Sequence, residues 1–243
     1  GSCFRALFCV CCWIRVRLSG LDVALSDMGA SDRPVALICN STSVIDVALM
    51  AAYGPKQQIA KARLLTGAKY RRIPIFGVIL QALGTSLLNM KRKKSAEKDR
   101  SRVEMNTKSL QEFEQHVADG GTAVWFPESR MNTSGCAEVG FFRPGSFCLP
   151  VRVDMEIWCC VFIGASDCWP GKAVFGGRPA NIGVNIFRLC ESSHAFVSEA
   201  TGSPGLEDER AASAWLAQKA HDAVQSAVTE AASGRKLCQQ GRE

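Results

Sequence analysis

The order of apolar and polar stretches along the chain predicts strands and helices that follow one another. Residues 34–39 form a short apolar run, and polar residues 40–43 follow it, so we expect a buried strand that ends in a turn. Residues 44–53 then predict a helix that stops at Gly54-Pro55. Serine and threonine hydroxyls in the turn can cap the free amides at the start of that helix.

The second half of the chain continues this alternation. Residues 99–118 carry apolar side chains at helical spacing, and residues 122–126 predict a strand that runs into a polar turn. Residues 155–163 predict a buried strand, 166–190 short strands and turns, and 207–232 an amphipathic helix. Strands that alternate with helices indicate an α/β fold, with a mixed, mostly parallel sheet flanked by helices.

The N-terminal segment, residues 3–14, is apolar except for Arg5. A helix that spans a bilayer needs about 20 residues, so this segment is too short to cross a membrane. The chain begins with Gly-Ser rather than Met, which fits a tag scar or a fragment that lacks an upstream membrane segment. We therefore expect a membrane-associating segment over 1–30, a main domain over 31–232 and a polar tail over 233–243.

Charge and cysteine content narrow the range of partners. The formal net charge of +6 favours nucleic acid, an anionic membrane surface or a phosphorylated substrate. No nucleic-acid fold signature or interleaving of aromatic and basic residues occurs, so we predict no nucleic-acid partner. Cys9 and Cys12 have C-x-x-C spacing, but no second pair or nearby histidine completes a zinc set, so no metal site is predicted. Acylation of the N-terminal cysteines is an open alternative.

Residues 124–130 place an acid and a base at the end of a predicted strand. Ligands bind at such strand ends in α/β folds, and the planar guanidinium of Arg130 could hold a phosphate through paired hydrogen bonds. The alternative is a solvated pair of Glu128 and Arg130 in a surface turn, which would contribute little energy.

Two segments resemble motifs of the glycerolipid acyltransferases of the lysophosphatidic acid acyltransferase type. Residues 126–130, Phe-Pro-Glu-Ser-Arg, resemble the family block Phe-Pro-Glu-Gly-Thr-Arg, with Ser129 in place of glycine. Residues 40–46 resemble Asn-His-x-x-x-x-Asp, with Ser41 at the position where the family has its catalytic histidine.

Two further blocks of the same family follow in the family's order. Residues 73–77, together with Gly84 and the basic pair Lys91-Arg92, resemble the second block, and residues 142–147 resemble the fourth. Lys61 occupies a position where the family often has a lysine ahead of the second block. The resemblance covers about residues 34–165, and it implies a fold like that of glycerol-3-phosphate acyltransferase.

This resemblance implies transfer of an acyl group from acyl-CoA or acyl carrier protein to a hydroxyl of a lysophospholipid or glycerol phosphate, without a cofactor. In the family the histidine removes the hydroxyl proton and the aspartate orients the imidazole. Asp46 keeps its role, but the hydroxyl of Ser41 cannot act as a base near neutral pH. We therefore expect impaired activity, with a non-catalytic lipid-binding protein of the same fold as the alternative. Ser41 is either an introduced change or the natural state of a degenerate member.

The resemblance also implies roles for the other residues of the four blocks. We expect the phosphate to be held by Glu128, Ser129, Arg130, Lys91 and Arg92, and the pocket to be formed by Asn40, Pro74, Gly77, Gly84, Arg143 and Gly145. His194 lies in a predicted loop and is a candidate for a substitute base. The implied partners are lysophospholipid, acyl-CoA and a membrane surface, with the domain on the cytosolic face of an internal membrane. The oligomeric state stays open.

Overall fold

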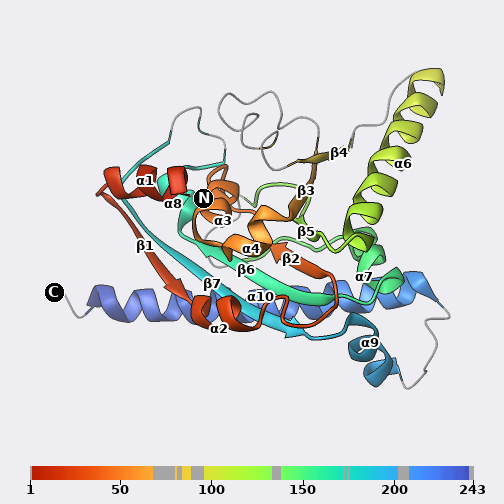
Figure 1. Cartoon of the computed structure of the whole chain (residues 1–243). Helices are drawn as coiled ribbons and strands as arrows, with labels where there is room; N and C mark the ends of the chain where they lie inside the picture. The colour runs from red at the N-terminus through yellow and green to blue at the C-terminus, as the bar shows by residue number, and fades with distance from the viewer. Residues whose placement is uncertain are drawn as a thin grey trace.

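The centre of the molecule is a sheet of seven strands (Figure 1). The computed structural model describes residues 2–67, 80, 84–88, 96–132, 138–171, 173, 176–201 and 208–240. The strands are β1 (Ile14–Ser19), β2 (Val35–Cys39), β3 (Ala62–Gly67), β4 (Ser86–Leu88), β5 (Thr122–Trp125), β6 (Glu156–Ile163) and β7 (Ala180–Cys190). They are arranged in the order β1-β7-β6-β2-β5-β3-β4, and every neighbouring pair is parallel except β6 and β7. The predicted mixed, mostly parallel sheet is therefore confirmed.

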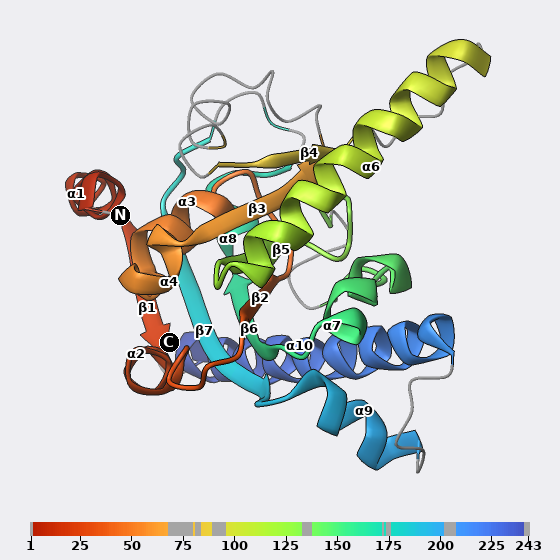
Figure 2. The ribbon, with the colours of Figure 1, turned by 45° about the vertical axis from the view of Figure 1, so that its right-hand side comes forward.

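Helices cover both faces of this sheet (Figure 2). One face packs against α1 (Ser2–Val10), α2 (Leu21–Asp27), α3 (Asp46–Tyr53), α4 (Lys56–Ala60) and α8 (Ala165–Cys168). The other face packs against α6 (Ala96–Ala118), η2 (Pro144–Phe147), α7 (Cys148–Arg152), α9 (Ser193–Thr201) and the long α10 (Glu209–Gln240). The sheet thus lies between two hydrophobic cores.

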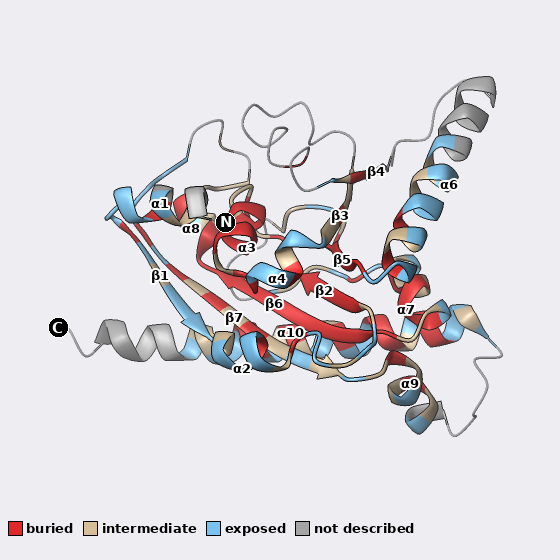
Figure 3. Cartoon of the chain, viewed as in Figure 1, coloured by how far each residue is buried: buried red, intermediate tan, exposed pale blue. Residues whose placement is uncertain are grey.

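Strand β2 lies in the middle of the sheet and explains why residues 34–39 are continuously apolar. Its side chains alternate between the cores: Leu37 and Cys39 join the α3 side, whereas Ala36 and Ile38 join the α10 side. All five residues of β2 are buried, as the red central strands of Figure 3 show. A strand buried on both faces needs apolar residues at every position, and parallel sheets are built from such strands.

Three segments differ from the sequence prediction or extend it. Residues 180–190, expected as short strands and turns, form the single long strand β7. Helix α10 continues to Gln240, through residues assigned to a polar tail. Residues 14–27, assigned to the N-terminal segment, form β1 and α2, and β1 pairs with β7 in the main sheet. None of the described helices is both long and apolar enough to span a membrane.

Candidate active site

The two motif loops meet at the carboxyl edge of the sheet, because β2 and β5 are neighbouring parallel strands. Asn40, directly after β2, fixes the end of that strand to β6. Its Nδ2 donates to the carbonyl of Phe162 at 2.9 Å, and its Oδ1 accepts from the Phe162 amide at 2.7 Å. The amide side chain of Asn40 is buried and therefore acts as a structural clamp at the base of the loop.

Glu128 joins the loop after β5 to the loop after β2. Its Oε1 accepts a hydrogen bond from the Ser41 amide at 2.8 Å, and its Oε2 accepts one from the Gly140 amide at 2.9 Å. The carbonyl of Ser41 accepts a bond from the Asn132 amide at 2.7 Å. Residue 41 is therefore held through its backbone from two sides. Within the described part of the chain the Ser41 Oγ makes no hydrogen bond, and the residue is 9% exposed.

Asp46 begins α3 and turns its carboxylate back onto the loop. Its Oδ2 accepts from the amides of Thr42 and Ser43 at 2.6 and 2.7 Å, while its Oδ1 has a longer contact at 3.3 Å with the Thr42 hydroxyl. The Ser43 Oγ accepts weakly from the Ile45 amide at 3.4 Å. The predicted helix is found as α3, but it begins at Asp46, two residues later than predicted, and its N-cap residue Ile45 makes no side-chain hydrogen bond to it. The motif aspartate therefore holds the loop ahead of α3 through the backbone amides of Thr42 and Ser43.

Both carboxylates hold their protons unusually firmly. Burial raises the pKa of Asp46 to about 7, against the opposing effect of its bonds to Ser43 and Thr42, and the negative charge of Glu128 raises it further. Burial likewise raises the pKa of Glu128 to about 7, although the amides of Ser41 and Gly140 oppose the rise. Desolvation disfavours the charged form of a carboxyl group, and here it outweighs two charge-stabilising hydrogen bonds. Near neutral pH this edge of the sheet can therefore hold exchangeable protons.

Arg130 and Arg143 are exposed at this same edge. Arg130 follows Glu128 in the loop after β5, and the amide of Arg143 donates to the carbonyl of Pro127 at 3.1 Å. The motif block at residues 126–130 and the fourth block at residues 142–147 thus lie side by side. Ser129 has a φ of +57°, a conformation that glycine adopts freely, and glycine is the residue of the family block at this position. Gly145 is exposed, and a Cβ added at this position would meet no atom within 4 Å.

The second block is only partly seen. Gly84 is exposed, with a φ of +57°. Pro74, Gly77, Lys91 and Arg92 lie outside the described residues.

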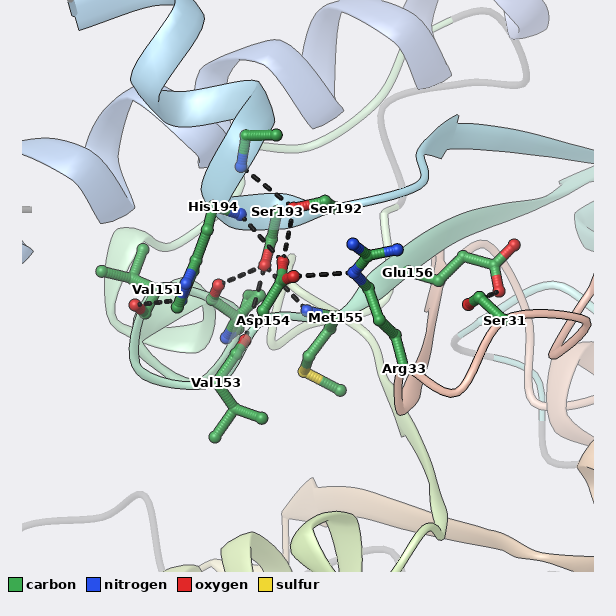
Figure 4. A network of polar contacts seen from close by, with 12 residues as sticks. Ser31, Arg33, Val151, Val153, Asp154, Met155, Glu156, Ser192, Ser193 and His194 are labelled. Atoms are coloured by element: carbon green, nitrogen blue, oxygen red, sulfur yellow. Dashed lines mark hydrogen bonds and ion pairs between the residues drawn. The ribbon is translucent and has the colours of Figure 1, made fainter. Parts of the chain in front are cut away.

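Two of the residues considered from sequence lie at the other edge of the sheet. Lys61 precedes β3, and its carbonyl contacts Nε2 of His116 at 2.8 Å. His194 lies in the first turn of α9, near the start of β6, where its Nε2 contacts the carbonyl of Val151 at 2.9 Å and its amide donates to Asp154 (Figure 4). Since the motif loops lie at the carboxyl edge, the suggestion that His194 replaces the missing base is wrong.

His221, on α10, is the histidine whose charge reaches the site. It packs edge-on against Phe142, with ring centroids 5.3 Å apart, and its Nε2 lies 3.4 Å from the carbonyl of Val139. Its electrostatic effect lowers the pKa of Glu128, against the larger and opposite effect of burial. The sequence analysis did not identify Gly140, because this glycine lies in none of the motif blocks. Its part in the site follows only from the hydrogen bond that its amide donates to Glu128.

A central parallel sheet with two polar loops joined at its carboxyl edge is the arrangement of an α/β enzyme site. A model of the Acyltransferase family matches residues 16–163. This match covers more than half of the chain, and the chain therefore belongs to the Acyltransferase family. No match was found among curated proteins.

One similar solved structure is the crystal structure of PlsC, the 1-acyl-sn-glycerophosphate (LPA) acyltransferase of Thermotoga maritima. The TM-score is 0.60 at 16% sequence identity, and the match covers 90% of this chain and 72% of PlsC. At this identity the likeness shows the fold. The predicted family and the acyltransferase-like fold are both confirmed.

Proposed function

We propose that this domain transfers a fatty acyl group from acyl-CoA to the free hydroxyl of lysophosphatidic acid or a related lysophospholipid, and that Ser41 impairs the reaction. The observation that carries the proposal is the bond from the Ser41 amide to Glu128 at 2.8 Å. It brings together two motif loops that are 87 residues apart in the sequence. Position 41 is thereby fixed at the carboxyl edge of the sheet, where a base would act on a bound hydroxyl.

The polar groups at this edge divide into a positioning set and a binding set. Glu128 is buried and both of its oxygens accept backbone amides, so it positions the loop and leaves the phosphate to cationic side chains. Arg130 and Arg143 are exposed and close to that loop, and a guanidinium binds phosphate through two parallel hydrogen bonds. Lys91 and Arg92 would add charge to the same substrate group.

Asp46 would orient a base at position 41. Its Oδ2 is occupied by two amides, whereas its Oδ1 has only the contact from Thr42 among the described residues. Oδ1 is therefore the oxygen that would hold an imidazole. With serine at this position the base is missing, and general-base help contributes about 10²–10⁴-fold to such reactions.

A lipid-binding protein without turnover is the second candidate, and one observation favours it. The pKa of Asp46 is raised to about 7 by burial, so its carboxyl group is partly neutral at physiological pH. A neutral carboxyl group stabilises a charged base poorly. This candidate keeps the arginines and binds lysophospholipid without acylating it.

The two candidates separate in one assay. Transfer of a radiolabelled acyl group from acyl-CoA to a panel of lysophospholipids is measured for the chain as given and for Ser41→His, with lipid binding measured in parallel. Turnover by Ser41→His on a phosphate-bearing acceptor supports the transferase. Binding without turnover in both proteins supports the second candidate, and absence of binding in both overturns the proposal.

We also propose that the domain works at a membrane surface, on the cytosolic face of an internal membrane. Both implied substrates carry long acyl chains and partition into bilayers. The net charge of +6 favours an anionic surface, at about 1 kcal/mol for each nearby Lys or Arg. Binding to vesicles with and without anionic lipid tests this, and equal binding to both would contradict it.

A further inference from the structure

The turn between α1 and β1 projects at one end of the molecule. It lies at the left tip in Figure 1, beyond the edge strand of the sheet, and Figure 3 colours much of this region as exposed. Two backbone bonds shape the turn: the Cys12 amide donates to the carbonyl of Val10, and the Ile14 amide donates to that of Cys11. The turn therefore presents a short, ordered stretch of chain to the surroundings.

Three cysteines lie at this junction, Cys9 near the end of α1 and Cys11 and Cys12 in the turn, and they differ in exposure. Cys9 and Cys12 are exposed, whereas Cys11 is half-buried and packs against the hydrophobic core beside Cys168. Four other described cysteines, Cys39, Cys159, Cys160 and Cys168, are buried in that core or the opposite one. Among the cysteines whose exposure the structure describes, Cys9 and Cys12 are thus the two exposed thiols, and they lie three residues apart, at the end of α1 and in the turn that follows it.

The surroundings of these thiols are apolar and basic. Val10, between them, is 76% exposed, and Trp13, directly after them, is 49% exposed. The exposed Arg15 and Arg17 follow on β1, the edge strand. Exposed apolar side chains next to arginines suit a membrane interface, in which tryptophan and basic residues are favoured.

A metal site does not explain the grouping of Cys9, Cys11 and Cys12. Within the part of the chain that the structure describes, no three histidine, cysteine or acidic side chains converge well enough to hold a metal ion.

We infer that Cys9 and Cys12 are sites of S-acylation by a long-chain fatty acyl group. In each event the cysteine sulfur attacks the carbonyl carbon of a long-chain acyl-CoA. A new sulfur–acyl thioester bond forms, the acyl–sulfur bond to CoA breaks, and CoA leaves as its thiol with the proton from the cysteine. A single acyl chain gives only marginal, reversible membrane binding, whereas two give stable anchoring. This inference does not depend on catalysis at the Ser41–Glu128 site.

The test counts acyl groups on the whole chain expressed in cultured eukaryotic cells. Free thiols are blocked, thioesters are cleaved with neutral hydroxylamine, and the released thiols are labelled with a polyethylene glycol maleimide that shifts the gel mobility once for each site. We expect two hydroxylamine-dependent shifts for the parent chain, one for Cys9→Ser or Cys12→Ser, and none for the double variant. The matched control Cys11→Ser should keep both shifts, because this thiol faces the core.

Three results would overturn the inference. The first is a parent chain without hydroxylamine-dependent shifts in cells where a co-expressed S-acylated protein shows them. The second is a double variant that keeps the shifts of the parent. The third is a disulfide between Cys9 and Cys12, found by mass spectrometry of the unreduced chain, in place of the thioesters. Thermal unfolding of each variant shows whether it is folded like the parent.

Discussion

Glu128 accepts a hydrogen bond from the backbone amide of Ser41 at 2.8 Å, and through this bond the loop after β5 holds the loop after β2. The second oxygen of the same carboxylate accepts the Gly140 amide at 2.9 Å. One buried side chain therefore fixes three segments at the carboxyl edge of the sheet. The geometry of the candidate active site therefore depends on this one carboxylate.

Removal of the Glu128 carboxylate should loosen the site and destabilise the domain. Glu128→Ala leaves the amides of Ser41 and Gly140 without their partner, at about 1–3 kcal/mol for each buried donor. Chemical denaturation should therefore show a loss of a few kcal/mol. Glu138→Ala is the matched control, because Glu138 is exposed, and it should unfold like the parent. Equal stability of the two variants would show that the Glu128 contacts contribute nothing.

Gly140 is expected to tolerate no side chain. A Cβ at this position would overlap Oε2 of Glu128, so Gly140→Ala must displace the carboxylate from its two amides. We expect a loss of about 1–3 kcal/mol, the usual cost of overpacking a well-filled site. Gly145→Ala, at a glycine whose Cβ would meet nothing, serves as the control in the same denaturation experiment. A Gly140→Ala protein as stable as Gly145→Ala would refute the contact.

The raised pKa of Asp46 gives a pH dependence with a defined sign. The pKa is about 7 in the folded protein and 3.8 as the ordinary value, so the folded state binds more protons between these pH values. Stability from this group is present at low pH and is lost as pH rises through about 7, at about 1.4 kcal/mol per pKa unit.

Thermal unfolding at several pH values measures this contribution. Between pH 8 and pH 5 the melting temperature of Asp46→Asn should rise less, or fall more, than that of the parent. Asp154→Asn is the control and should leave the shape of the profile over this range unchanged, because hydrogen bonds from Ser192 and Arg33 hold the pKa of Asp154 below 3.8 and the group is charged in both states. Identical profiles for Asp46→Asn and the parent would mean that Asp46 is charged throughout.

Ser129 adopts a conformation that suits glycine, with a φ of +57°. A left-handed conformation costs a residue with a Cβ about 1–2 kcal/mol, and a β-branched side chain more. Ser129→Gly should therefore be as stable as the parent or up to about 1 kcal/mol more stable. The gain is limited because glycine has more conformational entropy in the unfolded chain, which opposes the relief of strain in the folded one. Ser129→Val should be clearly less stable. Denaturation curves in the reverse order would contradict the backbone geometry.

The local sequence pattern was sufficient for a strand that is buried on both faces. Residues 35–39 of the predicted apolar run form β2, and the polar turn predicted after it leads into α3, which ends at Tyr53 as predicted. Motif order was sufficient for the family, because degenerate blocks in sequence order are more specific than any one of them.

Long-range contacts explain what was missed. The sequence pattern predicts short strands and turns over 166–190, yet residues 180–190 form one strand, which pairs with β1 over 180–185 and with β6 over 183–190. Its inward side chains Ile182, Val184 and Ile186 are buried while its polar residues point away, so the tertiary context outweighs local propensity. Likewise, the meeting of Gly140 with Glu128 depends on the packing of the chain, which spacing along the sequence does not encode.

The central claim is that this site lacks only its base, and a rate comparison tests it most directly. Acyl transfer from acyl-CoA to lysophosphatidic acid is measured for the parent, Ser41→His, and Ser41→His combined with Asp46→Asn. We expect Ser41→His to exceed the parent by about 10²–10⁴-fold, and the added Asp46→Asn change to remove most of that gain, because the imidazole loses its orienting carboxylate. A folded Ser41→His protein that binds lysophosphatidic acid but transfers no faster than the parent would contradict the claim.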